Sequence, residues 1–231
     1  MRVILIATMF CMTFCACDSV SQQRVKLKTK QDSVSYAIGV LNGKNMKQQE
    51  LDLDINLMTA GMKDAMSAEG KVLLSEEQIQ GIIMRFQNEA MLKQQEKMMK
   101  KADENKKKGE EFLAANKTKP GVQTTASGLQ YIVLKAGDGR SPVDSSQVKV
   151  HYRGTLIDGT EFDSSYKRGQ PAEFPVNGLI KGWQEALKLM KIGDKLQLFV
   201  PAELGYGMNA PPNIGPNQVL IFEMELLDIM K

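Results

Sequence analysis

The sequence predicts an α+β protein, with an all-helical N-terminal half followed by a strand-rich C-terminal half. In the first half, apolar residues recur at a spacing of three or four, which is typical of amphipathic helices. After about residue 128, apolar and polar residues alternate instead, as they do in strands. The stretch 117–127, "KTKPGVQTTAS", separates the two patterns and is rich in turn-forming residues. We therefore expect a helical domain over residues 31–116, a linker over 117–127 and a second domain over 128–231.

Three helices are expected in the first domain. Asp32 is a suitable N-cap for the first, and the second fits residues 55–67, "INLMTAGMKDAMS". The third begins after Ser75 and continues to about Asn116, supported by Glu and Lys residues at i, i+4 spacing. Such a helix would extend about 60 Å. Gly109 is the position at which it could break.

Methionine is concentrated in these helices, for example in the stripe formed by Met58, Met62 and Met66. One interpretation is adaptable filling of a core within one chain, because methionine packs into irregular gaps. The other is that such short helices cannot bury wide apolar faces alone and do so against a second copy. We expect a homodimer formed through the N-terminal helices.

The N-terminus has the layout of a secretory signal. A single basic residue precedes the apolar run "VILIATMFCMTF", which is too short to span a bilayer as a helix. Cleavage after residues 1–16 would leave Cys17 at the new N-terminus, and this arrangement resembles a bacterial lipoprotein signal. Residues 17–30 would then be a tether, and lipid on Cys17 would anchor the protein in a bacterial membrane of the cell envelope, facing the periplasm. The alternative is an ordinary signal peptide with incidental cysteines.

The charge of the chain does not favour a nucleic-acid partner. Its 30 basic and 27 acidic residues give a formal net charge of only +3. The lysine run 106–108 fits a solvated helix face better than a nucleic-acid contact.

The second domain contains five expected strands and one helix. The helix is indicated by Ile180, Trp183, Leu187 and Met190, whose spacing would place them all against a sheet. The strands are expected at residues 129–136, 147–157, 160–163, 195–201 and 219–230.

The stretch "GTEFDSSY" at 159–166 first suggests acid–base chemistry, because it places Asp163 and two serines near His151, the only histidine. Strand alternation argues against this, since Tyr152 would face inward and His151 the opposite way. The serines then lack a candidate base and are interpreted as turn residues. With one histidine and no cysteine after Cys17, His/Cys metal sites and cysteine nucleophiles are excluded. We expect neither a metal nor a cofactor.

Aromatic residues are the remaining feature of this domain. They could simply form a core, but Tyr206 lies in "AELGYGMNAPPNIGPN", which is too rich in Gly, Pro and Asn to be core. Its ring is expected to project from a loop, and aromatic residues around a concave apolar pocket are typical of a binding site. The set comprises Tyr152, Phe162, Phe174, Trp183, Tyr206 and Phe222.

Four motifs in order, "VHYRGTLIDGTEFDSSY", "GLIKGWQEALKLMKIGDK", "VPAELGYG" and "VLIFEMELLDI", resemble the FKBP-type peptidyl-prolyl cis-trans isomerases over about residues 127–231. The helical half, with its long connecting helix and the entry "SGLQYIVLKAGDG", is similar to the dimeric, secreted macrophage infectivity potentiator group. The resemblance implies a twisted antiparallel five-stranded sheet wrapped on one short helix.

The resemblance also implies a role for each pocket residue. Trp183 would be the floor, Asp163 a hydrogen-bonding residue at the rim with Arg168 near it, and the Ile180 N–H would meet a substrate carbonyl. Ile214 would contribute to substrate binding. The walls would be Tyr152, Phe162, Phe174, Leu179, Ile180, Tyr206 and Phe222.

The implied function is isomerisation of X–Pro bonds, assisting the folding of exported proteins. Its partners would be proline-containing polypeptides that are unfolded or still folding. Catalysis would be non-covalent, by stabilisation of the twisted amide in the aromatic pocket. One alternative is a holdase-type chaperone in which the pocket mainly binds clients. Another is an inert, lipid-anchored structural dimer.

Overall fold

The computed structural model describes residues 25–68 and 71–230, which form two compact units divided between Ser75 and Glu76. The signal segment, Cys17 and most of the expected tether lie outside the described residues. Among the described helices, none combines the length and the apolar character needed to cross a membrane.

The first unit contains helices α1 (Lys30–Gln48) and α2 (Ile55–Met66). The N-cap of α1 is Thr29 rather than Asp32, because Asp32 occupies the third helical position and completes a capping box with Thr29. Asp54 caps α2 by accepting from two backbone N–H groups. Both helices are fully described, and neither contains a buried residue.

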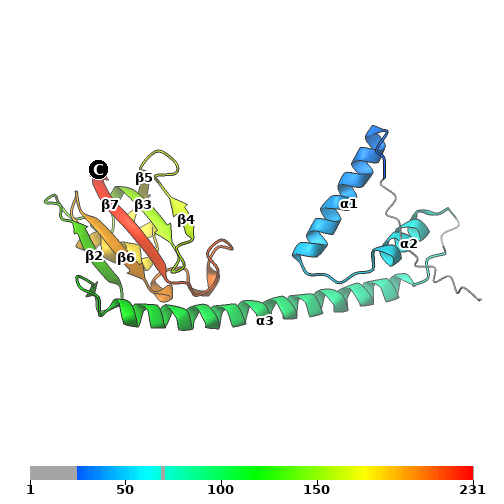
Figure 1. Cartoon of the computed structure of the whole chain (residues 1–231), viewed down its shortest axis with the longest axis horizontal. Helices are drawn as coiled ribbons and strands as arrows, with labels where there is room; N and C mark the ends of the chain where they lie inside the picture. Colours follow the sequence, from blue (N-terminus) through cyan, green and yellow to red (C-terminus); the bar gives the residue numbers. More distant parts are fainter. Residues whose placement is uncertain (1–24, 69–70, 231) are drawn as a thin grey trace, which may run out of the picture. The chain divides into compact units, whose positions relative to one another are not determined.

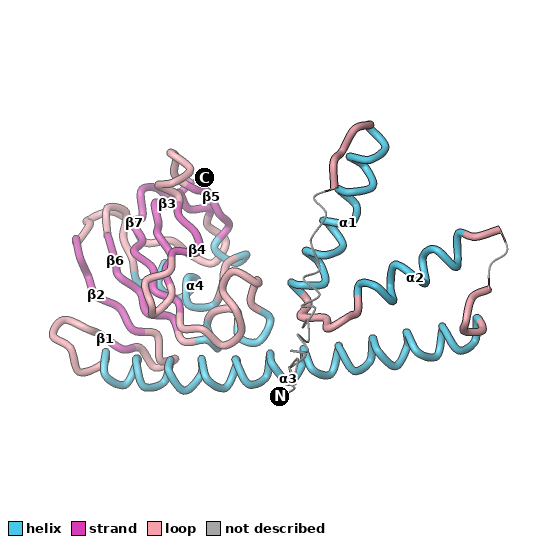
Figure 2. Tube along the Cα trace, turned by 45° about the vertical axis from the view of Figure 1, so that its right-hand side comes forward, coloured by secondary structure: helices cyan, strands magenta, loops and turns pink. Residues whose placement is uncertain are grey.

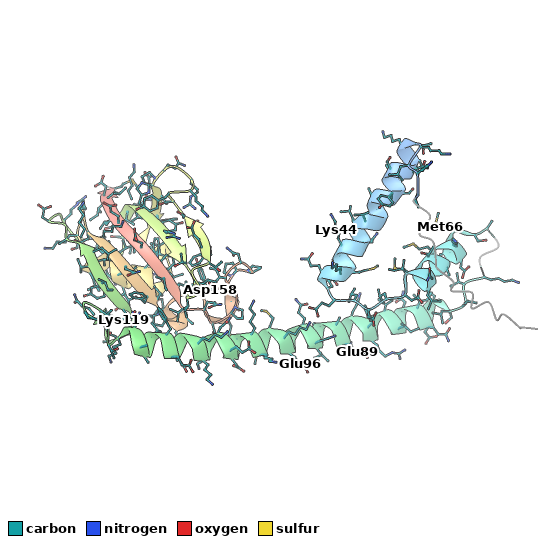
Figure 3. The ribbon with its side chains drawn as sticks, viewed as in Figure 1. Lys44, Met66, Glu89, Glu96, Lys119 and Asp158 are labelled. Atoms are coloured by element: carbon teal, nitrogen blue, oxygen red, sulfur yellow. The ribbon has the colours of Figure 1, made fainter. Side chains whose placement is uncertain are left out.

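Helix α3 (Glu76–Asn116) begins the second unit and runs for 41 residues without a break. The break considered at Gly109 is therefore absent. Glycine stands there because an added Cβ would lie 2.8 Å from Cγ2 of Val219, so the helix backbone packs directly on the strand-rich region. Glu89 and Glu96 lie closer to the start of α3, before this packed stretch (Figure 3).

The sheet has seven antiparallel strands in the order β1-β2-β6-β7-β3-β4, with β5 also pairing with β3 (Figure 1). The five expected strands are all present. Two more strands, β1 and β5, were not expected; they have two and four residues. The bounds are β1 Gln123–Thr124, β2 Gln130–Lys135, β3 Gln147–Thr155, β4 Glu161–Ser164, β5 Ala172–Pro175, β6 Lys195–Val200 and β7 Leu220–Met230.

One short helix, α4 (Lys181–Leu189), covers the inner face of this sheet (Figure 2). Its buried face contains Trp183 and Leu187, as the spacing predicted. Gly182 allows the close approach, because an added Cβ would lie 2.5 Å from Cγ1 of Val200 on β6. The core of the unit lies between α4 and the sheet.

Side-chain contacts join the end of α3 to the rest of its unit. Asn105 Nδ2 donates to the Pro216 carbonyl at 2.8 Å, and Asn116 Nδ2 donates to Gln130 Oε1 at 2.9 Å. Between them, the ring centroids of Phe112 and Phe199 are 6.0 Å apart. The two compact units therefore divide well before the linker expected at 117–127. The helical pattern in the sequence could not indicate this division, because it does not show which residues a helix contacts.

Candidate active site

A cavity of about 250 Å³ opens between the inner face of the sheet, α4 and the loop after β6. This volume is large enough for a proline ring and the backbone next to it. The lining includes every expected wall residue, together with the expected floor and Asp163. The full set is Tyr152, Phe162, Asp163, Phe174, Gly178, Leu179, Ile180, Trp183, Tyr206 and Phe222.

Trp183 lines the cavity and packs against three other rings. Its ring lies edge-on to those of Tyr152, Phe222 and Phe174, with centroid separations of 5.0, 5.1 and 6.1 Å. Edge-to-face contacts at these distances are favourable beyond the area that they bury. Within the described part of the chain, the buried Nε1 of Trp183 has no hydrogen-bond partner. Trp183 therefore adds an aromatic surface and one unpaired donor to the cavity lining.

The wall formed by Phe162 and Phe222 depends on a residue that the sequence interpretation missed, Gly154 on β3. The two rings meet edge-on at 5.6 Å. A Cβ on Gly154 would lie only 2.6 Å from Cζ of Phe162 and 2.9 Å from Cε1 of Phe222. A glycine inside an alternating strand indicates close approach to the backbone, so "HYRGT" carried a usable signal for this residue.

A polar network closes the rim. The Tyr152 hydroxyl donates to Asp163 Oδ2, while Arg168 forms an ion pair with Asp163 and donates to the Tyr152 oxygen at 2.8 Å. Arg168 thus lies beside Asp163 as expected, although it does not line the cavity. The backbone N–H of Ser164 also donates to Asp163, at 2.8 Å.

The network sets the charges at the rim. Partial burial alone would raise the pKa of Asp163, but hydrogen bonds from Tyr152 and Arg168 outweigh burial and lower that pKa. Burial, followed by the hydrogen bond to Asp163, raises the pKa of the Tyr152 hydroxyl. At neutral pH the rim therefore holds a carboxylate, a guanidinium and a neutral phenol. Asp163 is a fixed acceptor rather than a proton donor.

Ile180 supplies a backbone group to the cavity lining. It is the N-cap of α4, where the first N–H groups of a helix have no intrahelical acceptor. No hydrogen bond among the described residues uses the Ile180 N–H. The preceding carbonyl, of Leu179, is occupied by Gln184 Nε2 at 2.7 Å. A donor is thus available beside the apolar floor.

Tyr206 comes from the loop between β6 and β7 and is 42% exposed, as expected of a ring that projects from a loop. The loop contacts β4 through Asn213, whose Nδ2 donates to the Phe162 carbonyl at 3.4 Å. Ile214, expected to bind substrate, is instead 6% exposed, belongs to the core cluster and does not line the cavity. A Pro/Gly-rich loop gives no alternation from which its direction could be predicted.

His151 lies away from the cavity, on the face that alternation assigned to it. Its Nδ1 is 2.9 Å from the Ser165 hydroxyl, and its ring stacks on Tyr166 at 4.6 Å. Ser165 is fully buried and bonds to the Tyr152 backbone, so it is a structural residue. Within residues 25–68 and 71–230, no cluster of three His, Cys, Asp or Glu side chains could hold a metal ion. The site offers binding, orientation and exclusion of water, without a nucleophile.

Comparison with known proteins identifies both parts of the chain. Residues 138–227 match the FKBP-type peptidyl-prolyl cis-trans isomerase family, and residues 31–133 match the domain amino terminal to FKBP-type peptidyl-prolyl isomerase. The chain belongs to the FKBP-type peptidyl-prolyl cis-trans isomerase family. It is therefore an enzyme that acts on proline-containing polypeptides and assists their folding.

Individual relatives extend over both halves. The peptidyl-prolyl cis-trans isomerase Mip of Coxiella burnetii is 48% identical over 206 residues, covering 89% of each chain. The outer membrane protein MIP of Legionella longbeachae is 47% identical, covering 89% of this chain and 88% of the relative. The crystal structure of FkpA from Escherichia coli, 41% identical, matches 88% of this chain and 98% of that one with a TM-score of 0.69. These matches are consistent with the Mip group of the family.

Proposed function

We propose that the cavity accelerates X–Pro rotation by binding the twisted amide more tightly than the planar one. Amide resonance creates a barrier of roughly 18–20 kcal/mol, and the twisted state has lost that resonance. Its carbonyl depends less on water, so a dry aromatic site favours it over the solvated ground state. The observation that carries the proposal is the apolar floor at Trp183, with the Ile180 N–H available beside it.

The roles divide among a few groups. The proline ring packs on Trp183, and the substrate carbonyl accepts from the Ile180 N–H and the Tyr206 hydroxyl. Asp163 accepts a hydrogen bond from the substrate backbone at the rim. A million-fold acceleration would require differential binding of roughly 8 kcal/mol, which three or four such interactions can supply together. No proton is transferred.

The test compares pocket variants with a matched tyrosine outside the pocket. We expect Phe162→Ala and Tyr206→Phe to lower kcat/KM for an X–Pro peptide by about tenfold or more, because each removes a contact made to the twisted amide. Tyr166→Phe is the control, since Tyr166 is similarly exposed but stacks on His151. Circular dichroism confirms that each variant is folded. Unchanged kinetics in both pocket variants would exclude this assignment.

We further propose that the N-terminal helices form a homodimer. Their apolar side chains are largely exposed in the single chain, for example Leu41 at 67% and Leu57 at 72%. Sedimentation of residues 17–231 should give a dimer, and a chain that begins at Glu76 should sediment as a monomer with peptide isomerase activity within about twofold. A monomer in both cases would contradict the proposal. Neither the site nor the family matches favour the alternative of a holdase-type chaperone.

Cys17 is proposed to carry a lipid that anchors the protein in the cell envelope, facing the periplasm. The layout of the N-terminal segment supports this, as does a relative whose name describes it as an outer membrane protein. Cells grown with labelled palmitate should label the wild type but not Cys17→Ser, and only the wild type should sediment with membranes. Labelling of Cys17→Ser would exclude this anchor.

A further inference from the structure

The loop over residues 206–217 forms one side of the cavity, yet only Tyr206 within it lines the cavity. A backbone bond joins its two ends: the Asn217 N–H donates to the Gly207 carbonyl at 2.9 Å. Asn217 has φ of 51°, a left-handed conformation that is uncommon outside glycine. The loop therefore keeps a demanding geometry at the point where it returns to β7, and its anchoring matters for where Tyr206 lies.

Helix α3 provides an anchor at that point. Asn105 is 8% exposed, and its Nδ2 donates at 2.8 Å to the carbonyl of Pro216, the residue before Asn217. The flanking positions on the same helix face are small: Ala102 is 2% exposed, and Gly109 lies against Val219. Small neighbours let the helix approach closely enough for a short side chain to reach the loop. A buried amide in an apolar contact is costly unless it is bonded.

We propose that Asn105 is a positioning residue for the isomerase reaction. Its amide fixes the Pro216 carbonyl, and the adjoining bond between Asn217 and Gly207 transmits this constraint to Tyr206. The long helix would then contribute to the shape of a pocket that it does not line. This inference rests on the proposed role of Tyr206 in the pocket, and the experiment separates the two.

The chain offers a matched control in Asn116. It lies on the same helix, is 1% exposed and donates to Gln130 at 2.9 Å, but it contacts β2 rather than the loop. Full-length Asn105→Asp, Asn105→Ala and Asn116→Ala are compared. Asn105→Asp retains the shape of the side chain and, when ionised, removes the donor and places a carboxylate against a carbonyl. Both Asn105→Ala and Asn116→Ala remove a buried hydrogen bond, so their unfolding midpoints should fall by similar amounts.

The readouts are kcat/KM for an X–Pro peptide and the fluorescence of Trp183, the only tryptophan in the chain, which lies at the floor of the cavity. We expect both Asn105 variants to lower kcat/KM by about fivefold or more and to change the emission of Trp183 on peptide binding, because misplacement of a wall by about 1 Å is costly. Asn116→Ala should stay within about twofold of the wild type.

Kinetics in both Asn105 variants within about twofold of Asn116→Ala would overturn the proposal. If Tyr206→Phe and Phe162→Ala are both fully active, the pocket assignment itself has failed. If Tyr206→Phe is impaired while both Asn105 variants are normal, only the coupling to α3 has failed. Should Asn105→Asp not fold, Asn105→Ser serves in its place, since serine is too short to reach Pro216 and the same loss is expected.

Discussion

Leu57 on α2 and Leu198 on β6 have the same side chain but opposite degrees of burial. Leu57 is 72% exposed, whereas Leu198 is completely buried in the core between the sheet and α4. The contrast holds for the whole regions, because no residue of α1 or α2 is buried while the sheet has a continuous core. The sheet region buries its apolar side chains within one chain, whereas α1 and α2 do not.

This difference marks where the proposed second copy would pack. Helices of 19 and 12 residues are marginal in water without tertiary packing, and the exposed apolar side chains of α1 and α2 are the ones that the proposed dimer would cover. Matched substitutions in the two regions therefore separate the stability that comes from packing within one chain from the stability that comes from assembly.

The largest effect is expected from shortening the buried leucine. Leu198→Ala should lower the free energy of unfolding by about 2–5 kcal/mol, because it leaves a cavity in a packed core. Urea denaturation of the full chain, followed by circular dichroism, measures it.

The matched substitution on α2, Leu57→Ala, should lower the free energy of unfolding by less than about 0.5 kcal/mol at protein concentrations where the chain is monomeric. A larger cost that grows with protein concentration would show burial of Leu57 against a second copy. Equal costs for Leu57→Ala and Leu198→Ala in a monomer would break the comparison.

Glycine substitutions should give effects of opposite sign. Gly154→Ala places a Cβ within 2.6 Å of Phe162, so we expect a loss of about 1–3 kcal/mol in stability. The displaced wall should also lower kcat/KM by about tenfold. Gly39 on α1 has open space around it, and Gly39→Ala should stabilise the helix by about 0.5–1 kcal/mol.

Thermal unfolding and peptide kinetics on both glycine variants provide the measurement. Normal kinetics for Gly154→Ala would show that the Phe162 wall is adaptable. Destabilisation by Gly39→Ala would indicate close packing of α1 against a partner.

The smallest effect concerns pH. Hydrogen bonds from Tyr152 and Arg168 lower the pKa of Asp163 below its ordinary value of 3.8, despite partial burial. A carboxyl whose pKa is lowered by folding stabilises the fold above its unfolded pKa, and this contribution is lost as the pH falls through the lowered value. Activity should thus vary by less than about twofold between pH 5 and 8, since Asp163 and Arg168 stay ionised over this range.

Asp158 supplies the control for this pH dependence. It lies at the turn between β3 and β4 (Figure 3), and bonds from Thr160 lower its pKa as well. Asp158→Asn and Asp163→Asn should both lose acid-dependent stability, but only Asp163→Asn should lose activity. A steep activity change near neutral pH in the wild type would contradict a mechanism without proton transfer.

Most of the strand-rich half could be predicted because alternation is a local property. The pattern placed Tyr152 inward and His151 outward, and the spacing in α4 identified Trp183 as facing the sheet. What the pattern could not supply was short or irregular structure. The strand β1 has only two residues, the four residues of β5 end in a proline, and the loop direction that buries Ile214 follows no period.

The other differences come from contacts between residues far apart in sequence. Gly109 looked like a helix break because glycine weakens helices, whereas the structure uses its missing side chain against Val219. Nothing in the sequence around Asn105 marks it, yet it bonds to Pro216, 111 residues further along the chain. Pocket roles for the lining residues stay predictions until the kinetics are measured.

The strand β3 has one consequence for backbone dynamics. Along one edge it pairs with β5 near its start and with β4 near its end, and its middle is bridged by Ser165. The Ser165 hydroxyl accepts from the Tyr152 N–H at 2.8 Å, and the Ser165 N–H donates to the Tyr152 carbonyl at 2.9 Å. A single residue, through its hydroxyl and its backbone N–H, thus completes the ladder behind a pocket residue. The amide hydrogen of Tyr152 should exchange with solvent only when the Ser165 hydroxyl moves away. Its exchange rate would therefore report how often this part of the site opens.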